Sequence, residues 1–72
     1  MTGGILMIEK IYEFQVLNAI KDGKVIYAID FFEKRIVNLN IQEVSKVFDY
    51  IRQAEESSKS VEFYYIEEQR DE

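Results

Sequence analysis

The chain has 72 residues, 47% of them hydrophobic, and it contains no cysteine, histidine, tryptophan or proline. This length suits one small domain over residues 1–72, and the residue types exclude a disordered tail, a disulfide scaffold, a thiolate zinc site and histidine-based catalysis. Nine basic and fourteen acidic residues give a net charge of -5, which argues against direct nucleic-acid binding.

The N-terminal part of the chain predicts a flexible leader followed by a long strand. Residues 1–7 include Gly3 and Gly4, lack the basic region of a secretory signal, and end at Met7, which is an alternative start. From residue 8 to residue 20 apolar side chains alternate with others, and a period of two indicates a strand. One face of this strand carries Ile8, Tyr12, Phe14, Val16 and Ile20.

The dipeptide Asp22-Gly23 predicts a tight hairpin, because it tolerates the positive φ angles of a type I′ turn. Residues 25–32 would then form a second strand, antiparallel to the first. A two-residue turn places Val16 opposite Ile29 and so brings apolar side chains together on one face.

The middle of the chain predicts a charged break, a short strand and one amphipathic helix. Residues 36–39 form the strand, and Asn40 with Glu43 has the spacing of a capping box before a helix over residues 41–56. The apolar stripe of this helix recurs at helical spacing and comprises Val44, Val47, Phe48 and Ile51.

Residues 59–66 predict a last strand with Val61, Phe63 and Tyr65 on one face, and residues 67–72 predict an acidic tail that frays. The order β-β-β-α-β indicates an α+β fold. We expect a two-layer sandwich in which one helix covers an antiparallel meander. If the last strand returns beside the first, a right-handed crossover makes the two strands parallel.

A single helix covers only one face of such a sheet, and we expect the covered face to carry Phe14, Val16, Ile29 and Phe31. The uncovered face is more apolar than a face in water should be. Its polar members are Glu13, Gln15 and Asp30, and its apolar members are Ile11, Leu17, Ala19, Ile26, Ala28 and Phe32. Tyr64 and Ile66 extend it. The expected partner-binding residues are Ile11, Leu17, Ile26, Phe32, Tyr64 and Ile66.

Contiguous exposed apolar surface usually marks an interaction site. A domain of this size buries only about 60% of the surface that its unfolded chain exposes, so a partner surface would add stability. We therefore expect a non-enzymatic protein–protein interaction module that self-associates as a homodimer, through this face or through an edge strand. The alternative is that the leader or the tail folds over the face.

The residue types for catalysis and cofactor binding are scarce. Ser58 and Lys59 are adjacent in sequence, and such neighbours rarely face each other. Asp30 lies inside the second strand opposite Gln15, and a small enzyme that uses Asp30 or Glu33 is a minor alternative. The tail lacks the spacing of a calcium loop, and there is no phosphate-binding glycine motif. We expect no enzymatic activity, no metal and no cofactor.

The acidic residues are unevenly distributed, because residues 62–72 hold five of them against one arginine. Such a cluster could dock on a basic surface and inhibit a nucleic-acid-binding protein by imitating phosphates. The docking residues of this alternative are Glu62, Glu67, Glu68 and Asp71. A tail that aids solubility is the simpler interpretation. With no targeting signal and no apolar stretch of membrane length, we expect a cytoplasmic protein that binds no membrane.

Overall fold

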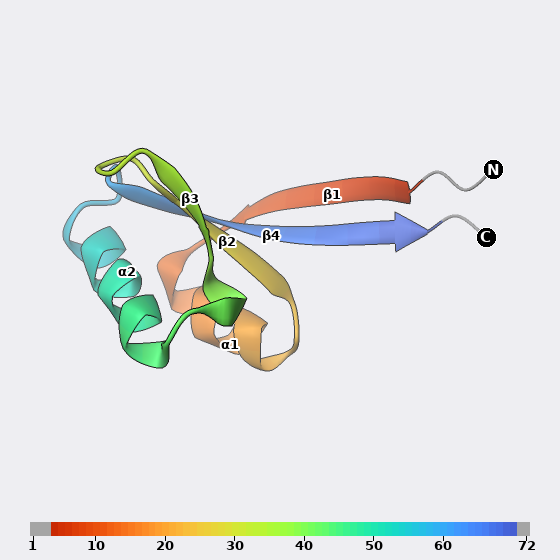
Figure 1. Ribbon diagram of the computed structural model, residues 1–72, viewed down its shortest axis with the longest axis horizontal. Coiled ribbons are helices and arrows are strands. Elements are labelled where there is room, and N and C mark those ends of the chain that lie inside the picture. Colours follow the sequence, from red (N-terminus) through yellow and green to blue (C-terminus); the bar gives the residue numbers. More distant parts are fainter. Residues whose placement is uncertain (1–3, 71–72) are drawn as a thin grey trace.

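The computed structural model describes the backbone of residues 4–70 and the side chains of residues 6–67. Four strands, two α-helices and two short 3₁₀ helices follow one another along this part of the chain (Figure 1). In order they are β1 (Gly4–Ile11), η1 (Glu13–Gln15), α1 (Val16–Lys21), β2 (Val25–Asp30), β3 (Arg35–Asn38), η2 (Leu39–Ile41), α2 (Val44–Glu56) and β4 (Val61–Arg70).

The strands form one antiparallel sheet in the order β1-β4-β2-β3, and both α-helices lie on one side of it (Figure 1). The predicted α+β class is confirmed. The predicted meander is wrong, because α1 separates the first two strands and β4 lies between them. β4 also runs antiparallel to β1, where the crossover prediction made the two parallel. Each helix instead joins two strands that point the same way and have one antiparallel strand between them.

The core lies between the sheet and the helices. Its buried hydrophobic members are Val16 from α1, Ile26 and Ala28 from β2, Leu39 from η2, Val47, Tyr50 and Ala54 from α2, and Val61 and Phe63 from β4. Tyr65 packs against them, so the predicted inward face of the last strand is confirmed. Because side chains alternate along a strand, the residues between these core positions point away from the helices.

Residues 12–21 differ most from the sequence prediction. The expected strand ends at Ile11, and the chain continues as η1 and α1. Val16 is fully buried, and Ala19 and Ile20 pack against the core. These three residues have the i, i+3, i+4 spacing of a helix face, and burial on that face outweighs the alternation that also runs through the segment.

Asp22-Gly23 ends α1 and does not turn a hairpin. Gly23 has a φ of 83°, and its N–H donates to the carbonyl of Ile20 at 3.0 Å. The N–H of Lys24 donates to the carbonyl of Ala19, also at 3.0 Å. These two bonds form a Schellman motif, which uses the same positive-φ glycine that a type I′ turn would use.

Helix α2 begins at Val44, and Asn40 does not cap it. The Asn40 side chain instead accepts a hydrogen bond from the N–H of Ile26 and donates one to the carbonyl of Lys24, both at 2.8 Å. These bonds hold the start of β2 against η2. The buried stripe of α2 is also rotated from the predicted one, because Val44 and Phe48 are exposed while Tyr50 and Ala54 are buried.

The two ends of the described chain pair with each other. Residues 4–7, expected in the leader, belong to β1, and residues 67–70, expected in the tail, belong to β4. The pairing of β4 with β2 stops at Ile66, so beyond it β4 pairs with β1 alone. A two-stranded arm therefore extends from the body of the molecule (Figure 1). The remaining parts of the two predictions, residues 1–3 and 71–72, lie outside the described residues.

Candidate docking surface

The side of the sheet opposite the helices is here called the open face. Strand alternation and the register of the four strands define it. Across the sheet, Ile8 pairs with Ile66, Tyr27 with Tyr64, and Ile29 with Ile36. The described residues of the open face are Leu6, Ile8, Lys10, Val25, Tyr27, Ile29, Ile36, Asn38, Glu62, Tyr64 and Ile66.

A shallow apolar groove of about 300 Å³ runs across the middle of the open face. All the residues that line it come from strands, and they are Ile8, Tyr27, Ile29, Ile36, Tyr64 and Ile66. Ile36 is 69% exposed and Ile8 is 59% exposed. Within residues 6–67, no helix residue contributes to the groove, so the described chain leaves this apolar surface in water.

The charged groups of the open face neutralise each other. Lys10 Nζ lies 3.3 Å from Glu62 Oε2, and the Tyr64 hydroxyl donates a hydrogen bond of 2.6 Å to Glu62 Oε1. The hydrogen bond from Tyr64 is the largest cause that lowers the pKa of Glu62, and Lys10 lowers it further. The Glu62 carboxylate in turn raises the pKa of Tyr64. Among the described side chains of this face, one positive and one negative charge therefore cancel.

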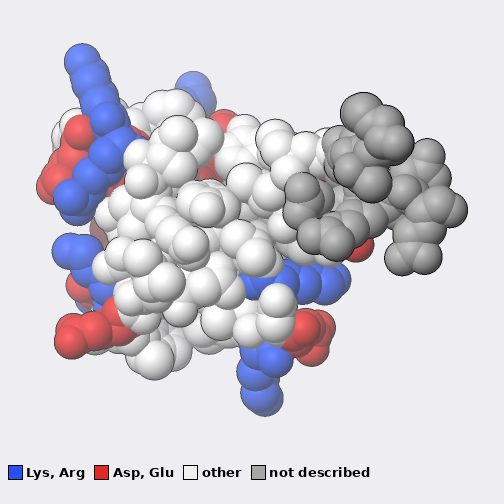
Figure 2. All heavy atoms as spheres, turned by 45° about the vertical axis from the view of Figure 1, so that its right-hand side comes forward, with Lys and Arg blue, Asp and Glu red and all other residues white. Residues whose placement is uncertain are grey.

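Uncharged surface also occurs elsewhere on the molecule. In Figure 2 the charged side chains lie mostly toward the edges of the visible face, and uncharged side chains fill its middle. Large exposed apolar residues outside the open face include Tyr12, Phe14, Phe32, Ile41 and Val44. Tyr12 and Phe14 stack on each other with ring centroids 5.6 Å apart.

Of the six predicted partner-binding residues, Tyr64 and Ile66 lie on the open face. Ile26 is fully buried toward the helices, and Ile11 packs against the core on the same side. The false hairpin register caused this reversal, because it turned Ile29 inward and Ile26 outward.

The remaining two predicted residues, Leu17 and Phe32, are exposed but lie off the sheet, on α1 and in the β2–β3 turn. The prediction missed Ile8, Tyr27, Ile29 and Ile36. The useful signal was in the last strand. Because side chains alternate along a strand, an inward face made of Val61, Phe63 and Tyr65 implies that Tyr64 and Ile66 point outward.

The predicted acidic docking residues do not form one cluster among the described side chains. Glu62 belongs to the open face and is paired with Lys10. Glu67 lies on the other face of β4, where it accepts a hydrogen bond from the Tyr65 hydroxyl and raises the pKa of Tyr65. The side chain of Glu68, and Asp71, lie outside the described residues.

Asp30, the minor catalytic candidate, is 4% exposed and lies opposite Arg35 and Val61 in the sheet, not opposite Gln15. Its Oδ1 accepts hydrogen bonds from the N–H groups of Phe32 and Glu33, at 2.9 and 3.1 Å. Through these two bonds, Asp30 stabilises the backbone of the β2–β3 turn. Glu33 is exposed and lies 3.2 Å from Arg35.

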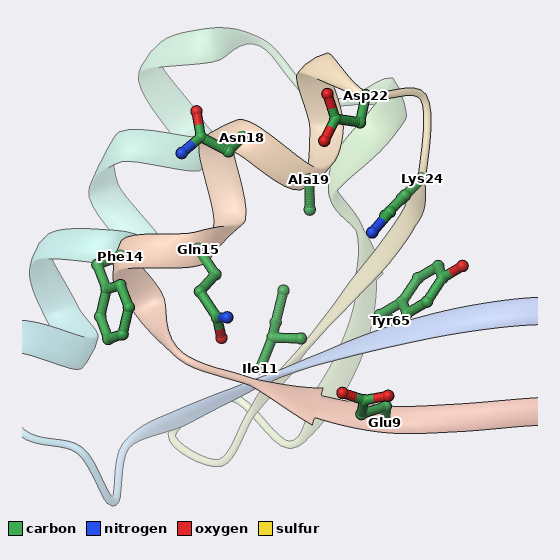
Figure 3. A pocket seen from close by; sticks show the side chains of 9 residues that line it. All are labelled: Glu9, Ile11, Phe14, Gln15, Asn18, Ala19, Asp22, Lys24 and Tyr65. Carbon is green, nitrogen blue, oxygen red and sulfur yellow. The ribbon is translucent and has the colours of Figure 1, made fainter.

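A second hollow, of about 420 Å³, lies on the helix side between α1, β1 and β4 (Figure 3). Ile11 and Ala19 point into it, and Glu9 and Asp22 approach it from opposite sides. Lys24 lies at its edge with Nζ 5.0 Å from the centre of the Tyr65 ring. None of the described side chains that line this hollow has a buried polar atom without a partner, so nothing in it demands a ligand.

Neither similarity to known proteins nor a metal site indicates what this surface binds. Comparisons with models of protein families, with curated proteins and with solved structures found no match for this chain. Among the described residues, no group of three acidic side chains is placed to hold a metal ion, and no helix is long and apolar enough to cross a membrane. Functional inference therefore depends on the geometry of the surfaces.

Proposed function

We propose that this chain is a non-enzymatic interaction module that binds a second copy of itself through the open face. The apolar groove across that face, lined by strand residues alone, carries the proposal. Apolar groups such as Ile36 gain free energy when they leave water, at about 25 cal/mol per Å² of buried area. A second sheet packed against the groove would provide that burial.

Charge favours a second copy as the occupant. The whole chain has a net charge of -5, so two copies repel each other over most approaches. The described part of the open face is neutral, because Lys10 and Glu62 pair with each other. Two copies can meet there without placing like charges together, whereas a basic partner would gain nothing at this face.

The size of the face sets the expected strength. Four strands about 4.8 Å apart and about 20 Å long give a face of roughly 400 Å² in projection. Interfaces at the small end of the range are typically weak. We therefore expect a dimer with a dissociation constant on the order of micromolar.

Light scattering after size-exclusion chromatography tests the proposal, with the chain loaded at concentrations from about 5 to about 500 µM. The wild-type mass should rise toward that of two chains. Ile36→Glu places a charge in the groove and should give a monomer. Ile41→Glu is the matched control, because Ile41 is 77% exposed and lies in η2, which contributes no residue to the groove. It should dimerise like the wild type.

A wild type that stays monomeric at every concentration would refute the proposal. So would equal loss of dimer in both variants, since that would place the interface elsewhere or show that added charge alone separates the copies. Circular dichroism of Ile36→Glu should match the wild type, which shows that the change acts at the surface.

A further inference from the structure

Strand β1 lies at the edge of the sheet, and within residues 4–70 it pairs with β4 alone (Figure 1). It is eight residues long and keeps one unbroken register with β4, whereas β3, at the opposite edge, has four residues. Proteins usually shorten, bend or block an edge strand with proline, because a long edge is a template for another strand. β1 has no bulge and no proline, so its outer side remains suited to pairing.

Hydrogen bonds elsewhere in the sheet show which backbone groups of β1 point outward. In an antiparallel sheet, the N–H and C=O of one residue point to the same neighbouring strand, and successive residues alternate. The N–H of Phe31 donates to the carbonyl of Ser60 at 3.0 Å, so odd-numbered residues of β2 bond to even-numbered residues of β4. The odd-numbered residues of β4 then bond to those of β1. The backbone groups of Leu6, Ile8 and Lys10 therefore point outward, and they are here called the outer edge.

Two further hydrogen bonds agree with this alternation. Ile26, an even-numbered residue of β2, donates its N–H to Asn40 Oδ1, on the side away from β4. Tyr12, which follows the outer edge at the same spacing, donates its N–H to Gln15 Oε1 at 2.9 Å. The row of outward groups therefore ends at Tyr12, and no strand of residues 4–70 lies beside it.

The side chains next to the outer edge indicate what kind of strand fits there. Leu6 and Ile8 lie on the open face, and each is 59% exposed. Glu9 points to the other side, is exposed, and forms no salt bridge among the described side chains, whereas Lys10 is already paired with Glu62. Directly opposite residues of paired strands share a face and interact. A matching strand therefore has apolar residues opposite Leu6 and Ile8 and a lysine or arginine opposite Glu9.

A second copy of β1 matches this edge less well. Antiparallel pairing centred on Glu9 places two Glu9 carboxylates opposite each other, and pairing centred on Ile8 leaves Glu9 opposite Met7. Both copies also carry a net charge of -5, which attracts a basic segment and repels another copy. Charge therefore favours a basic segment of a different protein.

We propose that the outer edge of β1 binds an extended segment of a partner protein, which joins the sheet as an additional antiparallel strand. The backbone groups of Leu6, Ile8 and Lys10 form its hydrogen bonds, and a lysine or arginine of the segment pairs with Glu9. This mode of recognition combines main-chain hydrogen bonds with selection of alternate side chains. It uses the edge of the sheet, whereas the proposed dimer uses its face.

NMR titration of the isotope-labelled full chain with the peptide acetyl-Thr-Lys-Val-Thr-Val-amide tests the site. When the lysine of this probe lies opposite Glu9, its two valines lie opposite Ile8 and Leu6. Saturable shifts are expected at the backbone amides of Leu6, Ile8 and Lys10, with a dissociation constant on the order of millimolar. Hydrogen exchange at these three amides should slow when the probe is added. Saturable shifts only at other residues, or none, would overturn the proposal.

Two N-methylated forms of the probe test the direction of the hydrogen bonds. Methyl groups on both valine nitrogens block the side of the peptide that faces β1, so this form should not bind. Methyl groups on the nitrogens of the lysine and the middle threonine point away from β1, so this form should bind like the unmethylated probe. The two forms have the same composition and side chains. Equal binding by both, or the reverse preference, would contradict pairing at the outer edge.

Variants of the chain test the ion pair. Glu9→Gln should lower affinity for the probe about twofold to fivefold, as expected for one exposed ion pair. Glu55→Gln is the matched control, because Glu55 is exposed on α2 and the change in net charge is the same. It should bind like the wild type. Equal effects of the two variants would show that only the overall charge attracts the peptide, and the assigned contact with Glu9 would be wrong.

A second pair of variants tests the backbone donor. Leu6→Pro removes an outward N–H without removing a bond to β4 and should abolish binding, whereas Leu6→Ala keeps the N–H and should retain it. Circular dichroism checks that both variants fold, and the methylated probes give the same test without altering the chain. Binding by a folded Leu6→Pro variant would refute the assignment.

Ile36→Glu separates this site from the proposed dimer. The substitution changes the groove and leaves the outer edge intact, so the variant should bind the probe like the wild type. Loss of binding would place the peptide in the groove and overturn the edge site. Normal binding by a wild type that proves monomeric would refute the dimer and leave the edge site supported.

Discussion

Glu62 is a carboxylate of the open face, and its neighbours shift its ionisation. Its pKa is lowered from 4.5, first by the Tyr64 hydroxyl and then by Lys10. A carboxyl with a lowered pKa in the folded state binds fewer protons there than in the unfolded chain. Its contribution to stability is therefore full above pH 4.5 and is lost as the pH falls below that value through the lowered pKa.

Tyr64→Phe should raise the pKa of Glu62 toward its ordinary value and so reduce the loss of stability on acidification. Urea unfolding at about pH 6 and about pH 3.5 measures that loss. Tyr27→Phe, on the same face, is the control. Between the two pH values it should lose as much stability as the wild type does. Equal acid sensitivity in all three proteins would show that the hydrogen bond to Tyr64 does not shift Glu62.

Substitutions of Asp30 test whether its hydrogen-bond acceptor or its charge stabilises the β2–β3 turn. Asp30→Asn keeps an oxygen that accepts from Phe32 and Glu33, so the free energy of unfolding should fall by less than about 1 kcal/mol. Asp30→Ala leaves both N–H groups without their acceptor and should lower it by about 2 to 3 kcal/mol. Urea denaturation distinguishes them. Similar losses in the two variants would mean that the charge of Asp30, not its acceptor, stabilises the turn.

At the level of elements, the end of α1 depends on the positive φ of Gly23. Apart from Gly23 itself and its two chain neighbours, no atom lies within 4 Å of the position that a Cβ would take, so a side chain there meets no obstacle from the rest of the fold. Gly23→Ala should therefore lower the free energy of unfolding by about 1 kcal/mol through backbone strain alone. Gly23→Asn should lower it less, because asparagine tolerates this conformation. Thermal unfolding measures both, and an alanine variant as stable as the wild type would contradict the Schellman geometry.

Gly23 also explains where sequence reasoning failed. Asp-Gly after an apolar segment fits a hairpin turn and a helix end equally well, because both need a positive φ. The choice depends on whether the segment before it has period two or period 3.6. Residues 12–20 contain both patterns, and contact of Val16 with the core decides for the helix. That information is tertiary and is absent from the local sequence.

The later elements were more predictable. Strands at 25–30, 35–38 and 61–70, and a helix ending at Glu56, match the predicted ones within a few residues at most of their ends. β4 is the exception, because its pairing with β1 carries it through residues predicted as a tail. Helix α2 has apolar residues over a wide arc, and neighbours in η1 and β4 decide that Tyr50 and Ala54 are buried while Phe48 is exposed.

At the scale of the whole molecule, the number of layers was more predictable than the membership of each layer. Helices that lie on one side of a four-stranded sheet leave the other side bare, whatever the strand order. Sequence reasoning therefore anticipated an apolar uncovered face. It misplaced Ile26 and Ile29, because it assigned the faces of the second strand from a pairing with residues 14–20, which form η1 and α1 instead of a strand.

The response to salt separates the proposed dimer from acidic docking on a basic protein. Two copies, each with a charge of -5, repel each other, and the described part of the open face is neutral and contributes little attraction between charges. Raising NaCl from about 20 mM to about 300 mM screens that repulsion, so the dissociation constant of the dimer should fall severalfold. Sedimentation equilibrium measures it, and Ile36→Glu should remain monomeric at both concentrations. A dimer that dissociates as salt is added would show that opposite charges hold it together. The apolar groove would then not be its basis.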